Sequence, residues 1–248
     1  MKPQTILFDL DDTLVHCNKY YEVIIEQFVD QMLTWFGAYE LSAHEVKQKQ
    51  LELDTGYIQL HGFSVEHFPL SFVKAYLHYS YLFGRLPSEN ETVFLTRLGK
   101  SVFECEIEPY PDMVETLTEL QRAGHQLVLY TGGVEQLQWK KIRTMHLESF
   151  FADRVFIRQH KNVSALEGIL LTERYDRRRT WMIGNSLRTD VGPALELGIH
   201  SIHVTAFTEW DYNIVEIDTI PKGAFLKLSA LREVPPAIYN YMIQSNLS

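Results

Sequence analysis

The chain has 248 residues, of which 46% are hydrophobic, so it is long enough for one large domain or for a core with a small second domain. A formal net charge of −9 argues against the basic surface that nucleic-acid binding requires, and we expect no nucleic-acid partner. The two cysteines, Cys17 and Cys105, form no paired motif, which favours a reduced, cytoplasmic setting. No apolar run reaches the length of a membrane span, and the first predicted strand begins too early for a signal peptide.

The chain opens on a short apolar strand, predicted over residues 5–10, and then changes to helical spacing. Between residues 21 and 36 the apolar side chains recur at helical intervals, and Gly37 can end this helix. Residues 71–83 are rich in Tyr, Leu and Phe and predict a further helix. We find no strand pattern between about residue 19 and residue 104.

Two capping-box patterns predict where other helices of this region begin. In such a box, Ser or Thr and the Glu three residues later satisfy two N–H groups that a helix start leaves free. Ser42 with Glu45 fits this pattern, and so does Ser88 with Glu91. An all-helical stretch of this size, inserted after the first strand of an α/β pattern, predicts a small cap domain, which we place at residues 17–100.

The α/β pattern resumes after this insertion. Pro111 suits the first position of a helix, and Gly124 follows the end of that helix. Further predicted elements alternate, with strands over 126–130, 154–157, 181–183 and 201–204 and helices over 135–146, 163–174 and 190–197. This alternation implies right-handed crossovers, so we predict an α/β fold with a Rossmann-like parallel-sheet core from residues 1–16 and 101–248. The tail from residue 221 is predicted to add one or two helices.

Carboxylates follow the first strand directly, in the run Asp9–Leu14 (DLDDTL). Ligands of open α/β sheets bind at the carboxyl ends of strands, and Asp9 and Asp11 share one face if the extended backbone continues. Two close carboxylates repel and require a cation or a proton between them, a role that suits Mg²⁺. The chemistry that fits is a carboxylate nucleophile with an adjacent acid/base and a metal. The competing interpretation is an acidic turn after a strand.

The run DLDDTL after an apolar strand resembles the first motif of the haloacid dehalogenase-like (HAD) hydrolases, most of which are phosphatases. The resemblance implies that Asp9 attacks phosphorus and forms an aspartyl-phosphate. It also implies that Asp11 protonates the leaving oxygen and then activates the water that hydrolyses this intermediate. Asp9 and the backbone carbonyl of Asp11 would in addition bind Mg²⁺.

One further stretch resembles the second motif of the family, and a lysine lies where the family places one. Leu127–Gly132 (LVLYTG) is an apolar strand that ends in a hydroxyl residue, so Thr131 and the N–H of Gly132 are expected to bind phosphate. Strands that end in Thr-Gly are also ordinary turn chemistry. Lys161 follows the next strand, where the family has a lysine that neutralises the nucleophile and the transferred group. Without the resemblance it is one surface lysine among several, with Arg158 as a competitor.

Trp181–Asp190 (WMIGNSLRTD) resembles the fourth motif, with one departure. The family usually has Asp after the Gly, and here that position is Asn185, whereas the second acid is retained as Asp190. The resemblance therefore implies Mg²⁺ ligands at Asp9, Asp11, Asn185 and Asp190. An Asn carbonyl can bind Mg²⁺ but brings no charge, so either the metal binds less tightly or Asp190 carries more of the binding.

Together the motifs predict a Mg²⁺-dependent phosphatase of HAD type that hydrolyses a small phosphorylated metabolite, as a monomer or small homo-oligomer. A phosphomutase uses the same residues and stays open as an alternative. A catalytically weak protein that binds a phosphometabolite is a second alternative, supported only by Asn185. Dehalogenation is disfavoured, because displacing a halide needs neither a metal nor the leaving-group acid Asp11.

Overall fold

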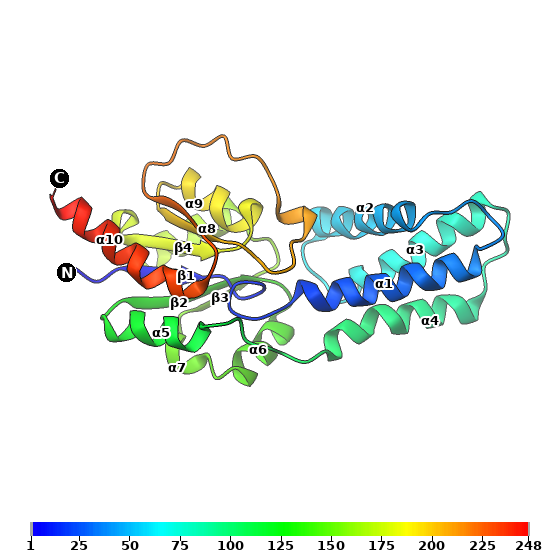
Figure 1. Ribbon diagram of the computed structural model, residues 1–248, viewed down its shortest axis with the longest axis horizontal. Coiled ribbons are helices and arrows are strands. Elements are labelled where there is room, and N and C mark those ends of the chain that lie inside the picture. The colour runs from blue at the N-terminus through cyan, green and yellow to red at the C-terminus, as the bar shows by residue number, and fades with distance from the viewer. Residues whose placement is uncertain (1, 248) are drawn as a thin grey trace. The chain divides into compact units, whose positions relative to one another are not determined.

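The structure, a computed structural model, describes residues 2–247. The chain folds into two compact units, one formed by Met1–Asn18 with Ile107–Ser248 and the other by Lys19–Glu106 (Figure 1). The first unit has α/β architecture, and the second is helical. Every residue that the sequence predicts to take part in chemistry belongs to the α/β unit.

A six-stranded parallel sheet forms the centre of the α/β unit, in the order β3-β2-β1-β4-β5-β6. The strands are β1 Thr5–Phe8, β2 Gln126–Gly132, β3 Val155–Arg158, β4 Thr180–Gly184, β5 His200–Val204 and β6 Phe225–Leu228. Phe8, the last residue of β1, pairs with Leu129 of β2 and Ile183 of β4. The segments that follow these strands therefore leave the sheet at one edge. This topology confirms the predicted α/β class with a parallel sheet.

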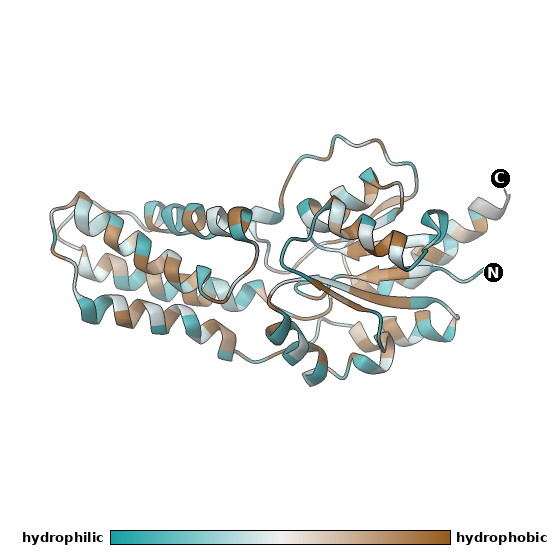
Figure 2. Ribbon diagram, turned by 180° about the vertical axis from the view of Figure 1, so that it is seen from behind, coloured by the Kyte–Doolittle hydropathy of each residue, from teal (hydrophilic) through white to brown (hydrophobic). Residues whose placement is uncertain are grey.

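Helices cover both faces of this sheet, which explains why its central strands are apolar along most of their length (Figure 2). Ile6 and Phe8 pack with α5, α7 and α10, whereas Leu7 faces the opposite side and packs with α8 and α9. The helices of the unit are α5 Met113–Arg122, α6 Glu135–Thr144, α7 Glu148–Phe151, α8 Val163–Thr172, α9 Gly192–Glu196 and α10 Val234–Leu247. A π-helical turn, Leu187–Val191, precedes α9.

The helical unit contains α1 Asn18–Trp35, α2 Ala43–His61, α3 His67–Leu82, α4 Glu89–Lys100 and a short 3-10 helix, Ser101–Glu104. Its core is aromatic, and the rings of Phe28 and Phe72 stack with centroids 4.2 Å apart. Gly99 permits α4 to approach α3, because a Cβ there would lie 2.6 Å from Pro69 Cα. Residues 19–104 are all described and contain no strand, as the sequence predicts. Within residues 2–247 no helix combines the length and apolar character needed to cross a membrane.

One of the two predicted capping boxes is present and the other is not. Ser42 Oγ accepts the N–H of Glu45 at 3.3 Å, and the Glu45 carboxylate accepts the N–H of Ser42 at 2.9 Å, which confirms the first box. At the second pattern α4 begins after Ser88, as predicted, but the capping box itself is absent because the Ser88 side chain caps no N–H group. Glu91 instead forms two bonds of 2.6 Å with the guanidinium group of Arg85. A bidentate ion pair is a stronger partner for this carboxylate than one backbone N–H.

Two predictions about the α/β unit are also wrong. Pro111 does not begin a helix, because α5 starts at Met113 after Asp112, whose φ of 62° turns the chain. The sequence pattern predicts only helices after residue 221, but the structure has strand β6 there before α10. β6 has four residues and pairs only with β5 at the sheet edge, so its own pattern is too short to indicate a strand.

Candidate active site

A buried lysine lies between two buried carboxylates at the carboxyl ends of β1 and β4. Lys161 Nζ is 2.5 Å from Asp9 Oδ1 and also forms an ion pair with Asp190 Oδ1. None of the three side chains is more than 8% exposed. When all three groups are ionised, the cluster carries two negative charges for one positive charge. It therefore attracts a further cation or a proton.

Burial and neighbouring charges shift the pKa values of Asp9 and Lys161 in opposite directions. Burial raises the pKa of Asp9 above its usual range, and the ammonium group of Lys161 opposes that shift. Burial alone would lower the pKa of Lys161, but Asp190 and Asp9 raise it above its ordinary value. Lys161 therefore stays protonated and is the fixed positive charge of the cluster.

The turn after β1 orients the carboxylate of Asp9. The N–H of Asp9 donates to Ile183 O at 2.9 Å and so extends the pairing of β1 with β4 by one residue. Thr13 Oγ1 donates to Asp9 Oδ2 at 3.2 Å. The third acid of the run, Asp12, has a φ of 58° and accepts the N–H of Asn18 at 2.9 Å. The Asp12 carboxylate therefore binds within the segment that follows β1, whereas the Asp9 carboxylate contacts Thr13 and Lys161.

Asp11 has a separate set of partners, both from α6. Gln138 Nε2 donates to Asp11 Oδ2 at 2.9 Å, and Lys141 Nζ lies 2.5 Å from Asp11 Oδ1. Neither residue is among the candidates that the motifs indicate. A signal is nevertheless present, because two polar residues three apart share one face of the helix that follows Thr131.

Gln138 also holds the end of β2. Its Nε2 donates to Thr131 Oγ1 at 2.8 Å and to Gly132 O at 3.0 Å. Gly133 has a φ of 138°, and a Cβ there would lie 3.1 Å from Gln138 Cδ, so this turn requires glycine. Thr131 and Asp11 therefore share a single amide group as hydrogen-bond donor.

The segment after β4 is folded around a close approach of Gly184 and Asp190. A Cβ at Gly184 would lie 2.1 Å from Asp190 Oδ2, which instead accepts the N–H of Ser186 at 3.0 Å. Asn185 is buried, and its Oδ1 lies 3.5 Å from Thr13 Oγ1. Its Nδ2 has no hydrogen-bond partner among residues 2–247, which marks a place for a ligand or water.

The donors around Asp9 fit a hard cation such as Mg²⁺. Asp9 and Asp190 already share one cation, the ammonium group of Lys161, and Thr13 contacts both Asp9 and the carboxamide of Asn185. Mg²⁺ prefers oxygen donors, keeps several waters and commonly binds one or two carboxylates, which is the number available here. In the described part of the chain no three His, Cys, Asp or Glu side chains gather to form a ligand cage.

The structure places all the predicted site residues in two adjoining clusters. The members of the first are Asp9, Lys161, Asp190 and, through Thr13, Asn185. The members of the second are Asp11, Thr131 and Gly132, joined by Gln138. Asp9 of the first cluster and Asp11 of the second are two residues apart in the chain, and Lys161 Nζ lies 5.0 Å from the ring centre of Tyr130, the residue before Thr131.

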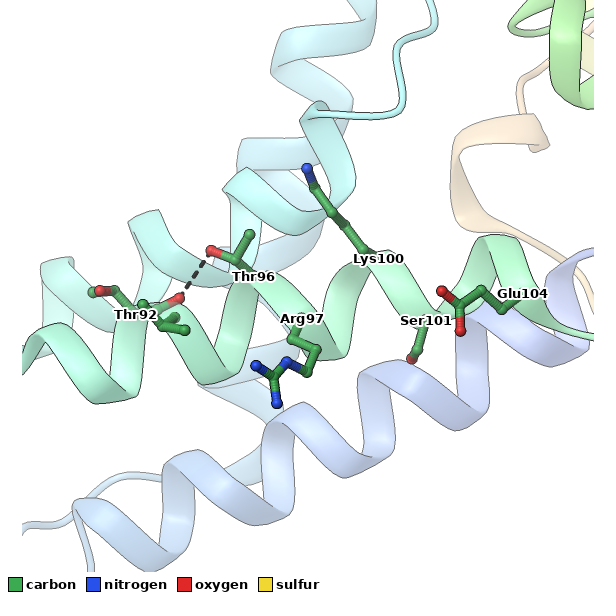
Figure 3. A pocket seen from close by; sticks show the side chains of 7 residues that line it. Thr92, Thr96, Arg97, Lys100, Ser101 and Glu104 are labelled. Carbon is green, nitrogen blue, oxygen red and sulfur yellow. Dashed lines mark hydrogen bonds between the residues drawn. The ribbon is translucent and has the colours of Figure 1, made fainter.

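A surface hollow of about 510 Å³ lies elsewhere, on the helical unit along α4 (Figure 3). It is lined by Thr92, Val93, Thr96, Arg97, Lys100, Ser101 and Glu104. Because none of these residues belongs to either cluster, the hollow is not part of the candidate active site.

Comparison with known proteins agrees with the motifs. A model of the family described as haloacid dehalogenase-like hydrolase matches residues 3–198. A glyceraldehyde 3-phosphate phosphatase from Methanothermobacter thermautotrophicus is 22% identical over 247 residues, which cover 93% of this chain and 99% of that protein. The sequence likeness therefore extends through both units.

Two solved structures share the fold. A haloacid dehalogenase-like family hydrolase from Xanthomonas campestris gives a TM-score of 0.78 at 22% identity and covers 99% of both chains. The HAD-hydrolase YfnB from Bacillus subtilis, described as bound to magnesium, gives a TM-score of 0.62 at 16% identity and covers 96% of this chain and 99% of its own. At these identities the likeness establishes the fold.

Proposed function

Because this chain belongs to the haloacid dehalogenase-like hydrolases, we propose that it is a Mg²⁺-dependent phosphatase that acts on a small phosphomonoester. The observation that carries this proposal is that two nearby carboxylates have different surroundings. Asp9 is buried beside Lys161, whereas Asp11, two residues later, lies among polar side chains of α6 and is partly exposed. The first carboxylate suits nucleophilic attack and the second suits proton transfer.

The first step transfers the phosphoryl group to Asp9. A carboxylate oxygen of Asp9 attacks phosphorus, the bond from phosphorus to the ester oxygen breaks, and the proton held by Asp11 goes to that oxygen. The products of this step are an alcohol and an aspartyl-phosphate. Lys161 and Thr13 contact the two oxygens of Asp9, so the nucleophile is oriented before substrate binds.

The second step regenerates Asp9. Asp11, now deprotonated, takes a proton from water as the water oxygen attacks phosphorus. The bond from phosphorus to Asp9 breaks, which releases inorganic phosphate and the free carboxylate. Asp11 thereby recovers the proton that it gave to the leaving group.

Mg²⁺ would be held by Asp9, Asp190, Asn185 and the backbone carbonyl of Asp11. When bound, it supplies positive charge that offsets the charge on the phosphoryl oxygens during transfer. The excess of negative charge around Lys161 supports this assignment, and so does the magnesium described for the Bacillus subtilis relative.

Three groups of this chain would bind the phosphoryl oxygens. They are the hydroxyl group of Thr131, the N–H of Gly132 and the ammonium group of Lys161. Thr131 Oγ1 accepts a hydrogen bond from Gln138, and Lys161 contacts two carboxylates, so both side chains are oriented before substrate arrives.

The first substrate to test is glyceraldehyde 3-phosphate, for which the similar phosphatase from Methanothermobacter thermautotrophicus is named. Its chemistry, a phosphate ester of a short-chain alcohol, falls within the class of small phosphomonoesters. The helical unit would act as the cap that selects the leaving group, and this role for the region predicted at residues 17–100 stays a prediction.

A phosphate-release assay over a panel of small phosphomonoesters, with Mg²⁺ and with EDTA, tests the proposal. We expect inorganic phosphate to be released from at least one ester and to require Mg²⁺. A phosphomutase would instead convert one ester into its isomer without releasing phosphate. A binding protein would bind the ester without turnover, and either result would replace the proposed function.

A further inference from the structure

Both carboxylate oxygens of Asp11 are held by side chains of one helix, α6. Oδ2 accepts from Gln138 Nε2 at 2.9 Å, and Oδ1 accepts from Lys141 Nζ at 2.5 Å. The side chain of Asp11 is nevertheless 26% exposed. The carboxylate is therefore accessible from solvent although each of its oxygens has a fixed partner, and the second lone pair of each oxygen is left for the proton that Asp11 exchanges.

Gln138 is built into the site and is not a surface residue, being only 2% exposed. Its amide nitrogen lies within 3.0 Å of acceptors on Asp11, Thr131 and Gly132. Because the amide has two hydrogens for three acceptors, it cannot move toward one acceptor without weakening its bond to another. A displacement of Asp11 would therefore also disturb the hydrogen bonds of Gln138 to Thr131 and Gly132 at the end of β2.

Lys141 approaches the same carboxylate from the next turn of α6. Its Nζ also lies 3.7 Å from Cys17 Sγ, on the turn that follows the Asp9–Leu14 run. Residues three apart on a helix share a face, so α6 presents an amide and an ammonium group together. Lys140, the residue before Lys141, is exposed.

We propose that Gln138 and Lys141 are positioning residues, a clamp that holds Asp11 where it exchanges a proton with the leaving oxygen and then with water. This inference rests on the proposed phosphatase function. Proton transfer requires donor and acceptor atoms within about 2.6–3.2 Å of each other. An unclamped Asp side chain on a turn has several rotamers, most of which point the carboxylate elsewhere.

The effect of the clamp depends on the leaving group. An alkoxide needs the proton from Asp11 as its bond to phosphorus breaks, whereas a nitrophenolate leaves without one. Loss of the clamp should therefore slow the hydrolysis of alkyl phosphates much more than that of p-nitrophenyl phosphate. A lysine that only stabilised the fold would affect both substrates equally.

The first test is Lys141→Met, which keeps the length of the side chain and removes its charge. We expect kcat for the best alkyl phosphate to fall about tenfold to a hundredfold, since acid–base catalysis contributes at least that much. The kcat for p-nitrophenyl phosphate should stay within about threefold, and KM should change little for either substrate. Lys140→Met is the matched control and should leave both rates unchanged. Circular dichroism checks the fold, and Lys141→Gln replaces Lys141→Met if the latter does not fold.

A double variant separates an effect through Asp11 from any other effect. With phenyl phosphate, whose leaving group is intermediate, Lys141→Met should cause no further loss in an Asp11→Asn background. Equal losses for alkyl and nitrophenyl phosphates, or an undiminished loss in the double variant, overturn the clamp but leave the phosphatase function standing. A wild-type protein that releases no phosphate from any ester overturns both proposals.

Discussion

Gly184 lies so close to Asp190 that a Cβ on residue 184 would be 2.1 Å from Asp190 Oδ2. Glycine is therefore the residue type that lets the acid lie against the end of β4. Asp190 in turn forms an ion pair with Lys161, which lies 2.5 Å from Asp9. The absence of a side chain at residue 184 thus leaves the space in which Asp190 reaches Lys161.

Gly184→Ala should displace Asp190 and weaken both stability and activity. We expect the free energy of unfolding to fall by about 1–3 kcal/mol, the usual range for overpacking, with a loss of phosphate release. Urea denaturation and the phosphate assay measure the two effects. Gly168→Ala on α8 is the matched control, because a Cβ there meets nothing within 4 Å and should stabilise the helix by about 0.5–1 kcal/mol. Equal effects of the two substitutions would contradict the role given to Gly184.

Lys161→Met should leave Asp9 and Asp190 facing each other without their shared cation. Removing one member of a buried ion pair typically costs about 3–5 kcal/mol, and we expect a loss of that size in EDTA. Mg²⁺ should restore more stability to this variant than to the wild type, because a bound cation replaces the missing charge. Thermal unfolding with Mg²⁺ and with EDTA measures the difference. An identical response of both proteins would show that the metal does not bind at these carboxylates.

Asn185→Asp should lower the Mg²⁺ concentration needed for half-maximal activity. Affinity for Mg²⁺ depends on ligand charge as well as geometry, and an added attraction near 1.4 kcal/mol corresponds to about tenfold. A Mg²⁺ titration of wild type and variant provides the comparison. If the wild type is active and its Mg²⁺ requirement does not change in Asn185→Asp, Asn185 is not a ligand, and Asp190 with water carries the metal.

The burial of Asp54, on α2 of the helical unit, predicts that the stability of the protein depends on pH. Burial raises the pKa of this carboxyl from 3.8 to about 7. Between these values the unfolded chain loses the proton while the folded chain keeps it, so stability falls as the pH rises. Asp54→Asn should remove this loss and gain stability over the wild type by at most about 1.4 kcal/mol per pH unit. Urea denaturation across this pH range measures the gain, and a pH-independent difference would be the opposing result.

The parallel sheet and most of the site follow from the sequence for one physical reason. Side chains that come directly after apolar strands gather at one sheet edge, so Asp9, Thr131 and Asn185 can be placed without any knowledge of helix packing. Lys161 and Asp190 lie further beyond the ends of β3 and β4, and the resemblance to the family motifs is what singles them out. The strand order and the outer elements are harder to predict from the sequence. β6, for example, forms by pairing with β5, and its own sequence pattern does not indicate a strand.

Gln138 and Lys141 could not be placed from the motifs, since their role depends on how α6 packs against the turn after β1. Their spacing is visible in the sequence, but the same spacing occurs on any exposed helix face. The failed capping box at Ser88 has a similar origin. Its predicted partner Glu91 has a stronger competitor in Arg85, which the turn before α4 brings near.

The measurement that tests the account most directly is the location of the phosphoryl group during turnover. Protein mixed with radiolabelled substrate and Mg²⁺ is quenched rapidly in acid, and peptide mass spectrometry locates the label. We predict label on the peptide that contains Asp9 in the wild type. Asp9→Asn should stay folded, carry no label and release no phosphate, because an amide is a poor nucleophile. Label on another residue, or full Mg²⁺-dependent activity in Asp9→Asn, would contradict the central claim.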